Sequence, residues 1–95
     1  MSIFGIVPQH IKPYFDLIEK LLEDRNLDSE WWKQDDRYNT IRLAVTISAH
    51  LSTLIKELTG KNVAIERIIS AEICASGHVD YSRKLALYAY ELSIE

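Results

Sequence analysis

Apolar residues recur along most of this chain at spacings of three and four, which is the period of an amphipathic helix. The pattern predicts a first helix from Pro13 to Asn26. Proline is tolerated in the first turn of a helix, and asparagine readily adopts the left-handed backbone that ends one. The apolar stripe of this helix comprises Tyr14, Leu17, Ile18, Leu21 and Leu22.

The longest run without a charged residue, Leu43 to Ile55, predicts a central helix that ends at Gly60. A bilayer-spanning helix needs about 20 apolar residues, so this run of thirteen residues indicates a core helix and no membrane segment. The helix starts at Asp28 or Ser29, or after a break within residues 35–40. Its predicted buried positions are Leu43, Ala44, Val45, Ile47, Leu51, Leu54, Ile55 and Leu58, with His50 interpreted as a core histidine rather than a ligand.

Two further helices are predicted over residues 63–76 and 81–94. Asn62 and Asp80 are suited to cap their first turns, and Gly77 ends the third helix. Charged residues in the third segment interrupt the alternation that a strand requires. Inward positions in the fourth helix are Leu85, Tyr88, Ala89 and Leu92. We therefore predict an all-α fold, a compact bundle of four helices with short connections.

The composition agrees with a folded chain, since 47% of its residues are hydrophobic and 26% are charged. Ninety-five residues predict a single helical domain, 1–95. The one cysteine excludes an internal disulfide, and with the three histidines it is too scattered for a structural zinc site. The first ten residues lack the features of a secretory signal, so we expect a cytoplasmic protein without a cofactor.

The net charge of −3 is distributed unevenly. Residues 16–36 hold eight acidic and three basic residues, a balance of −5, while the rest of the chain holds six acidic and eight basic residues. This distribution does not favour sequence-independent nucleic-acid binding, which requires clustered Lys and Arg. An acidic surface suits a basic protein partner, although most such surfaces are simply solvated.

Trp31 and Trp32 lie within this acidic segment, and adjacent helical residues point about 100° apart. We expect one ring in the core and the other at the edge of the acidic surface, where Trp often anchors interfaces. Our first hypothesis is a non-enzymatic interaction or modulator protein, which could work as a homodimer. Its predicted partner-binding residues are Trp31, Trp32, Asp35 and Asp36.

The segment CASGHVDYSRK, residues 74–84, offers two alternatives to that hypothesis. A Cys74–His78 nucleophile and base, or a metal site that adds Asp80, would indicate a small enzyme. A helix-turn-helix would indicate a DNA-binding regulator, with Arg83 and Lys84 as its only basic residues in the fourth helix. We favour a third interpretation, a corner between two helices, because glycine and a capping aspartate are sufficient to explain the pattern.

The stretch SGHVDYSRKLALYAYELSIE, residues 76–95, resembles the ends of small helical proteins encoded by bacteriophages. The resemblance covers about a fifth of the chain and transfers no catalytic or binding residue. It implies a compact accessory factor that acts in the bacterial cytoplasm by binding and modulating a host protein.

Overall fold

The first helix, α1 (Lys12–Asp24), begins and ends at local signals that the sequence carries. Pro13 occupies its first turn, and Asn26 adopts a positive φ of 56° just beyond its end. The amide of Asn26 donates to the Glu23 carbonyl at 3.0 Å, and the amide of Leu27 donates to the Leu22 carbonyl at 2.8 Å. These two bonds form a Schellman motif, which satisfies carbonyls at the helix end and fixes the direction in which the chain leaves.

In this computed structural model the described residues are 9–28, 30–33, 37–74 and 81–95, with side chains described at all of these except 37 and 71–74. Within them the chain forms α1, a 3-10 turn η1 (Trp31–Lys33), α2 (Arg37–Thr59), α3 (Ile65–Cys74) and α4 (Tyr81–Ile94). None of the described residues forms a strand, and the predicted all-α fold of four helices is confirmed.

Helix α2 is the longest of the described helices, and only part of it is covered by neighbours. Its buried positions are Leu43, Ile47, Ser48, Leu51 and Ile55. The prediction of burial was wrong at three positions: Val45 is 42% exposed, Leu58 is 54% exposed, and His50 is exposed. A helix of 23 residues is about 34 Å long, so the shorter helices around it cannot cover its whole circumference along its whole length.

The ends of α2 and α3 partly agree with the prediction. Gly60 has a φ of 77° and donates its amide to the Lys56 carbonyl at 2.9 Å, which confirms it as the stop of α2. Helix α3 begins at Ile65, two residues after the predicted start. Helix α4 has the predicted bounds, with Leu85, Ala89 and Leu92 buried. The predicted roles of Gly77 and Asp80 lie outside the described residues.

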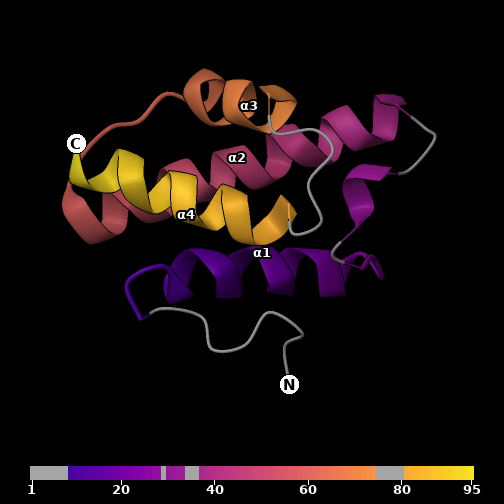
Figure 1. Ribbon diagram of the computed structural model, residues 1–95, viewed down its shortest axis with the longest axis horizontal. Helices are drawn as coiled ribbons and strands as arrows, with labels where there is room; N and C mark the ends of the chain where they lie inside the picture. Colours follow the sequence, from indigo (N-terminus) through magenta and orange to yellow (C-terminus); the bar gives the residue numbers. More distant parts are fainter. Residues whose placement is uncertain (1–8, 29, 34–36, 75–80) are drawn as a thin grey trace.

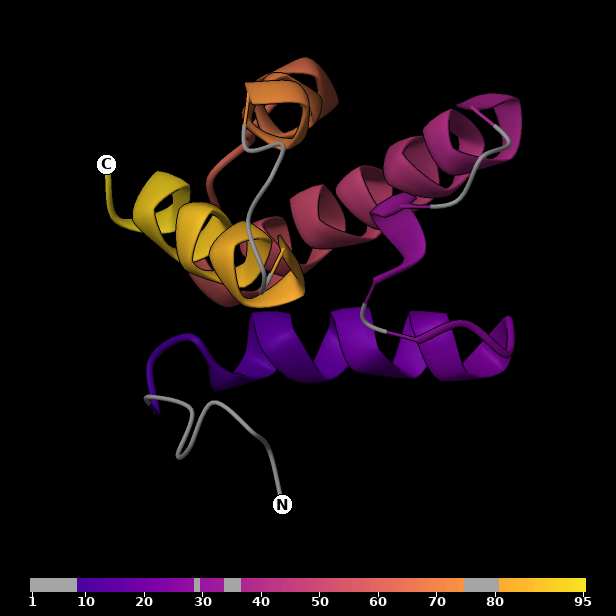
Figure 2. The same cartoon turned by 45° about the vertical axis from the view of Figure 1, so that its right-hand side comes forward.

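The helices are arranged with α1 and α3 on opposite sides and with α2 and α4 between them (Figures 1 and 2). Helix α4 contacts the other three, and α2 contacts both α1 and α3. The Cα radius of gyration is 12.5 Å, close to the value of about 12 Å expected for a compact chain of this length. The described helices therefore form one compact globule. No helix among them is long and apolar enough to span a membrane.

Candidate functional site

Both tryptophans of η1 contact the ring of Tyr81, at the start of α4. Trp31 is only 1% exposed and meets Tyr81 edge-on, with ring centroids 5.7 Å apart and an interplanar angle of 86°. Trp32 is half-buried, and its ring lies 5.4 Å from Tyr81. Lys33 places its Nζ 5.2 Å from the Trp32 ring centroid. Trp31 is thus a core residue, whereas Trp32 remains partly accessible.

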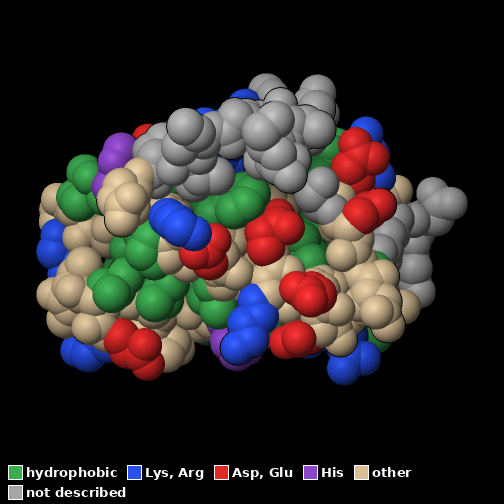
Figure 3. Space-filling view, turned by 90° about the horizontal axis from the view of Figure 1, so that it is seen from below, with side chains coloured by type: hydrophobic (Ala, Val, Ile, Leu, Met, Phe, Trp, Pro, Cys, Tyr) green, Lys and Arg blue, Asp and Glu red, His purple; other side chains and the backbone are tan. Residues whose placement is uncertain are grey.

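Of the predicted partner-binding residues, only Trp32 is both described and partly accessible. Trp31 is not available to a partner in this structure, and Asp35 and Asp36 lie outside the described residues. The acidic residues of α1 do not form a patch of one sign. Lys12 forms an ion pair with Asp16 at 2.8 Å, and acidic and basic side chains are interspersed over the face shown in Figure 3. Mixed charge of this kind is typical of a solvated helix face.

The residues of the enzyme and DNA alternatives are placed as follows. Cys74 is the last residue of α3, while His78 and Asp80 lie outside the described residues. His50 lies on the exposed side of α2, because it is about 100° round the helix from the buried Leu51. In the described part of the chain, no three His, Cys, Asp or Glu residues lie close enough together to hold a metal ion. Arg83 is half-buried and Lys84 is exposed.

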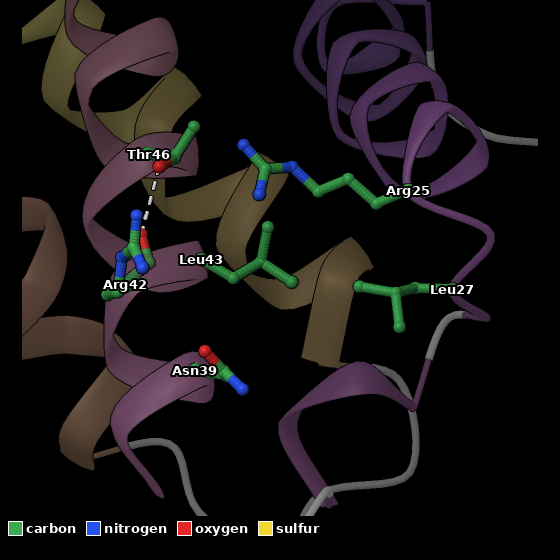
Figure 4. A pocket seen from close by; sticks show the side chains of 6 residues that line it. All are labelled: Arg25, Leu27, Asn39, Arg42, Leu43 and Thr46. Carbon is green, nitrogen blue, oxygen red and sulfur yellow. Dashed lines mark hydrogen bonds between the residues drawn. The ribbon is translucent and has the colours of Figure 1, made fainter. Parts of the chain in front are cut away.

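A groove of about 280 Å³ lies between the end of α1 and the first half of α2. We call it the two-arginine groove (Figure 4). The Schellman motif at Asn26 forms one side of it, since Arg25 and Leu27 flank this asparagine. The described residues that line the groove are Arg25, Leu27, Asn39, Arg42, Leu43 and Thr46.

Leu43, which is buried, lies between the two sides of the groove, and the Arg25 side chain extends past it toward Thr46 (Figure 4). Thr46 donates its hydroxyl to the Arg42 carbonyl at 2.9 Å, one turn earlier in α2. Ion pairs among the described residues join Lys12 to Asp16, Lys33 to Glu30 and Arg67 to Glu95, and neither groove arginine takes part. None of the described residues that line the groove carries a carboxylate. The described part of the lining is therefore positively charged, in a protein whose net charge is −3.

Three large apolar side chains lie exposed on the same half of α2. Tyr38 is 69% exposed, Ile41 is 60% exposed and Val45 is 42% exposed. Their spacing of three and four residues places them on one face of the helix, which we call the α2 apolar stripe. Arg42 connects this stripe to the groove, because its Cζ lies 5.7 Å from the centroid of the Tyr38 ring.

Sequence reasoning missed both the groove and the stripe. At about 100° per residue, the stripe lies roughly 115° round α2 from the centre of its buried positions, too far to belong to the same face. Val45 was predicted to be buried because it is apolar and lies within a largely buried run. Its angular distance from the other buried positions is the signal in the sequence that corrects this prediction. The groove has no comparable signal, because Arg25 and Arg42 come from different elements.

No protein family, curated protein or solved structure matches this chain. The resemblance of residues 76–95 to phage-encoded helical proteins stays a prediction, and the function has to be argued from the geometry.

Proposed function

We propose that this protein is a non-enzymatic protein-binding module that presents the first half of α2 to its partner. The observation that carries the proposal is the α2 apolar stripe, three large side chains exposed on consecutive turns of one helix. Exposed apolar side chains scattered singly over a surface need no explanation, but a group of them with a polar border is characteristic of an interaction site.

The exposed fractions of these three side chains give an estimate of the binding free energy that a partner would gain by covering them. Full burial of a Val, Leu, Ile or similar side chain contributes about 1.5–3 kcal/mol, so covering the exposed parts of these three residues would contribute about 3 kcal/mol in total. That is a small part of a specific affinity, so polar contacts at the border of the stripe must contribute the remainder. The neighbouring groove supplies the guanidinium groups of Arg25 and Arg42 for such contacts.

The chemistry of the groove supports binding over catalysis. The residues described in its lining include no thiol, imidazole or carboxylate that could act as a nucleophile or general base. The hydroxyl of Thr46 is already donated to a backbone carbonyl. The spacing of the stripe suits an elongated partner segment, since helices and extended peptides are recognised through anchors on one face. The resemblance of residues 76–95 implies a bacterial host protein, in the cytoplasm, as the partner.

The test compares two single substitutions of similarly exposed apolar residues. Tagged wild-type protein, the Ile41→Asp variant and the Leu58→Asp variant would each be used to capture proteins from bacterial lysate, with and without nuclease treatment, and the recovered proteins would be quantified by mass spectrometry. Leu58 is 54% exposed and lies near the other end of α2, so it is a matched control for Ile41. Circular dichroism would first establish that both variants retain the helical content of the wild type.

We expect a captured protein that is retained by Leu58→Asp and lost by Ile41→Asp. Equal capture by both variants would contradict the proposal, as would the recovery of no protein at all. Recovery that nuclease treatment abolishes would instead favour the DNA-binding alternative.

A further inference from the structure

The α2 apolar stripe and the two-arginine groove form one continuous surface on the first half of α2. Around the helix axis, Ile41, Val45 and Tyr38 are followed by Arg42, and then by Thr46 and Asn39 of the groove. The cation–π contact between Arg42 and Tyr38 spans the boundary between them. A segment that covers the stripe therefore also reaches the groove.

Arg25 and Arg42 indicate the charge of the partner segment that would cover this surface. Arg25 is the C-cap residue of α1, so its backbone is held by the Schellman motif at Asn26. Arg42 is held against the Tyr38 ring. A guanidinium presents a planar fork of N–H donors that matches a carboxylate, and neither of these two is engaged with a carboxylate of the described residues. Two positioned cations beside an apolar stripe complement an acidic, amphipathic segment.

We infer that the partner binds through an acidic amphipathic segment, with its apolar side chains on the α2 apolar stripe and a carboxylate in the two-arginine groove. This inference rests on the proposed function and adds the chemical class of the partner to it. The segment carries apolar residues at helical spacing and Asp or Glu on the side that faces Arg25 and Arg42.

Charge also argues against two other occupants of this surface. In a two-fold pairing of α2 with a second copy centred on Ile41, the two copies of Arg42 would approach each other, and like charges across an interface are unfavourable. A nucleic acid is bound through clustered Lys and Arg, and the described lining of the groove offers only Arg25 and Arg42, in a protein with a net charge of −3.

The experiment selects binders from a random library of displayed peptides about 16 residues long, which is enough for about four helical turns. Wild-type protein is the bait. The enriched peptides are then measured by fluorescence anisotropy against Ile41→Asp, against the charge-reversed double variant Arg25→Glu/Arg42→Glu, and against Lys20→Glu/Lys84→Glu. The last variant makes the same change in net charge at exposed lysines on α1 and α4, away from the lining of the groove.

We expect the enriched peptides to be rich in Asp and Glu and to carry apolar residues at spacings of three and four. Their affinity should fall at least about tenfold for Ile41→Asp and for Arg25→Glu/Arg42→Glu, since charge-assisted hydrogen bonds and buried apolar contacts each contribute on that scale. The control Lys20→Glu/Lys84→Glu should bind within about twofold of the wild type. Replacing the acidic residues of the best peptide by lysine should restore its binding to the charge-reversed variant.

The outcomes distinguish the inference of an acidic partner segment from the proposed function of protein binding. Peptides that require Ile41 but are neutral or basic, or that bind the charge-reversed variant as well as the wild type, would overturn the inference and leave the proposed function standing. An equal loss of binding in Lys20→Glu/Lys84→Glu would also overturn it, because net charge and not the groove would then be responsible. If no enriched peptide depended on Ile41, the proposed function itself would fail.

Discussion

Replacing Trp31 by alanine removes the largest fully buried side chain of the described residues. The indole is 1% exposed, and it ties η1 to α4 through its edge-on contact with Tyr81. Substitution of a buried Trp or Phe by Ala typically costs about 3–5 kcal/mol, and an aromatic pair contributes about 0.5–1.5 kcal/mol beyond the area it buries. We therefore expect Trp31→Ala to lower the free energy of unfolding by about 4 kcal/mol.

A loss of this size is large for this chain. Ninety-five residues at about 0.05–0.15 kcal/mol per residue correspond to a total stability of about 5–14 kcal/mol. Since 1 kcal/mol shifts the melting temperature of a domain of 60–100 residues by about 4–8 °C, we expect a decrease of about 15–30 °C. Trp32→Ala should cost less than half as much, because Trp32 is only half-buried.

Urea unfolding followed by circular dichroism measures both variants, with Trp31→Phe as a control that keeps an aromatic ring beside Tyr81. A loss below about 1 kcal/mol in Trp31→Ala, or an equal loss in Trp31→Ala and Trp32→Ala, would refute the assignment of Trp31 to the core. If Trp31 is a core residue, Trp31→Ala reduces partner binding only because it lowers the fraction of folded molecules. Ile41→Asp, in contrast, reduces the affinity of the folded protein.

Three further substitutions test other parts of the structure by the same urea assay. The hydroxyl of Ser48 is fully buried without a hydrogen-bond partner among the described residues, so Ser48→Ala should raise the stability by about 1 kcal/mol; a decrease would contradict this. Ser52 donates its hydroxyl to the Val63 carbonyl at 2.6 Å, so Ser52→Ala should instead lower the stability by about 1 kcal/mol, and the opposite sign of the two results is the check. Gly60 has a φ of 77°, and among the described residues no atom beyond its chain neighbours lies within 4 Å of the place that a Cβ would occupy there, so Gly60→Ala should cost about 1 kcal/mol through backbone strain alone; an unchanged midpoint would show that this strain is absent.

The features that were predictable from the sequence are those that depend on neighbouring residues. Asn26 and Gly60 end their helices because left-handed backbone is accessible to them, a property that no tertiary contact has to supply. The bounds of α4 and its buried positions followed from the spacing of apolar residues along one segment. The number and type of helices could be predicted for the same reason.

The features that were missed depend on which neighbours cover which side of a helix. Helix α2 has 23 residues against 14 in α4 and 10 in α3, so Leu58 and Val45 remain exposed although their apolar character suggested burial. The sequence predicted that one of the two tryptophans is buried, but the choice of Trp31 depends on Tyr81, which comes from a distant segment. The two-arginine groove likewise exists only because the end of α1 approaches α2.

The central claim is that the first half of α2 contacts a partner, and site-specific photo-crosslinking in living bacteria tests it most directly. Benzoylphenylalanine would replace Val45 in one strain and Leu87 of α4, which is 41% exposed, in a control strain. We expect a crosslinked product with a second protein from position 45 and none from position 87. Equal products from both positions, no product from position 45, or a product that contains only two copies of this chain would contradict the claim.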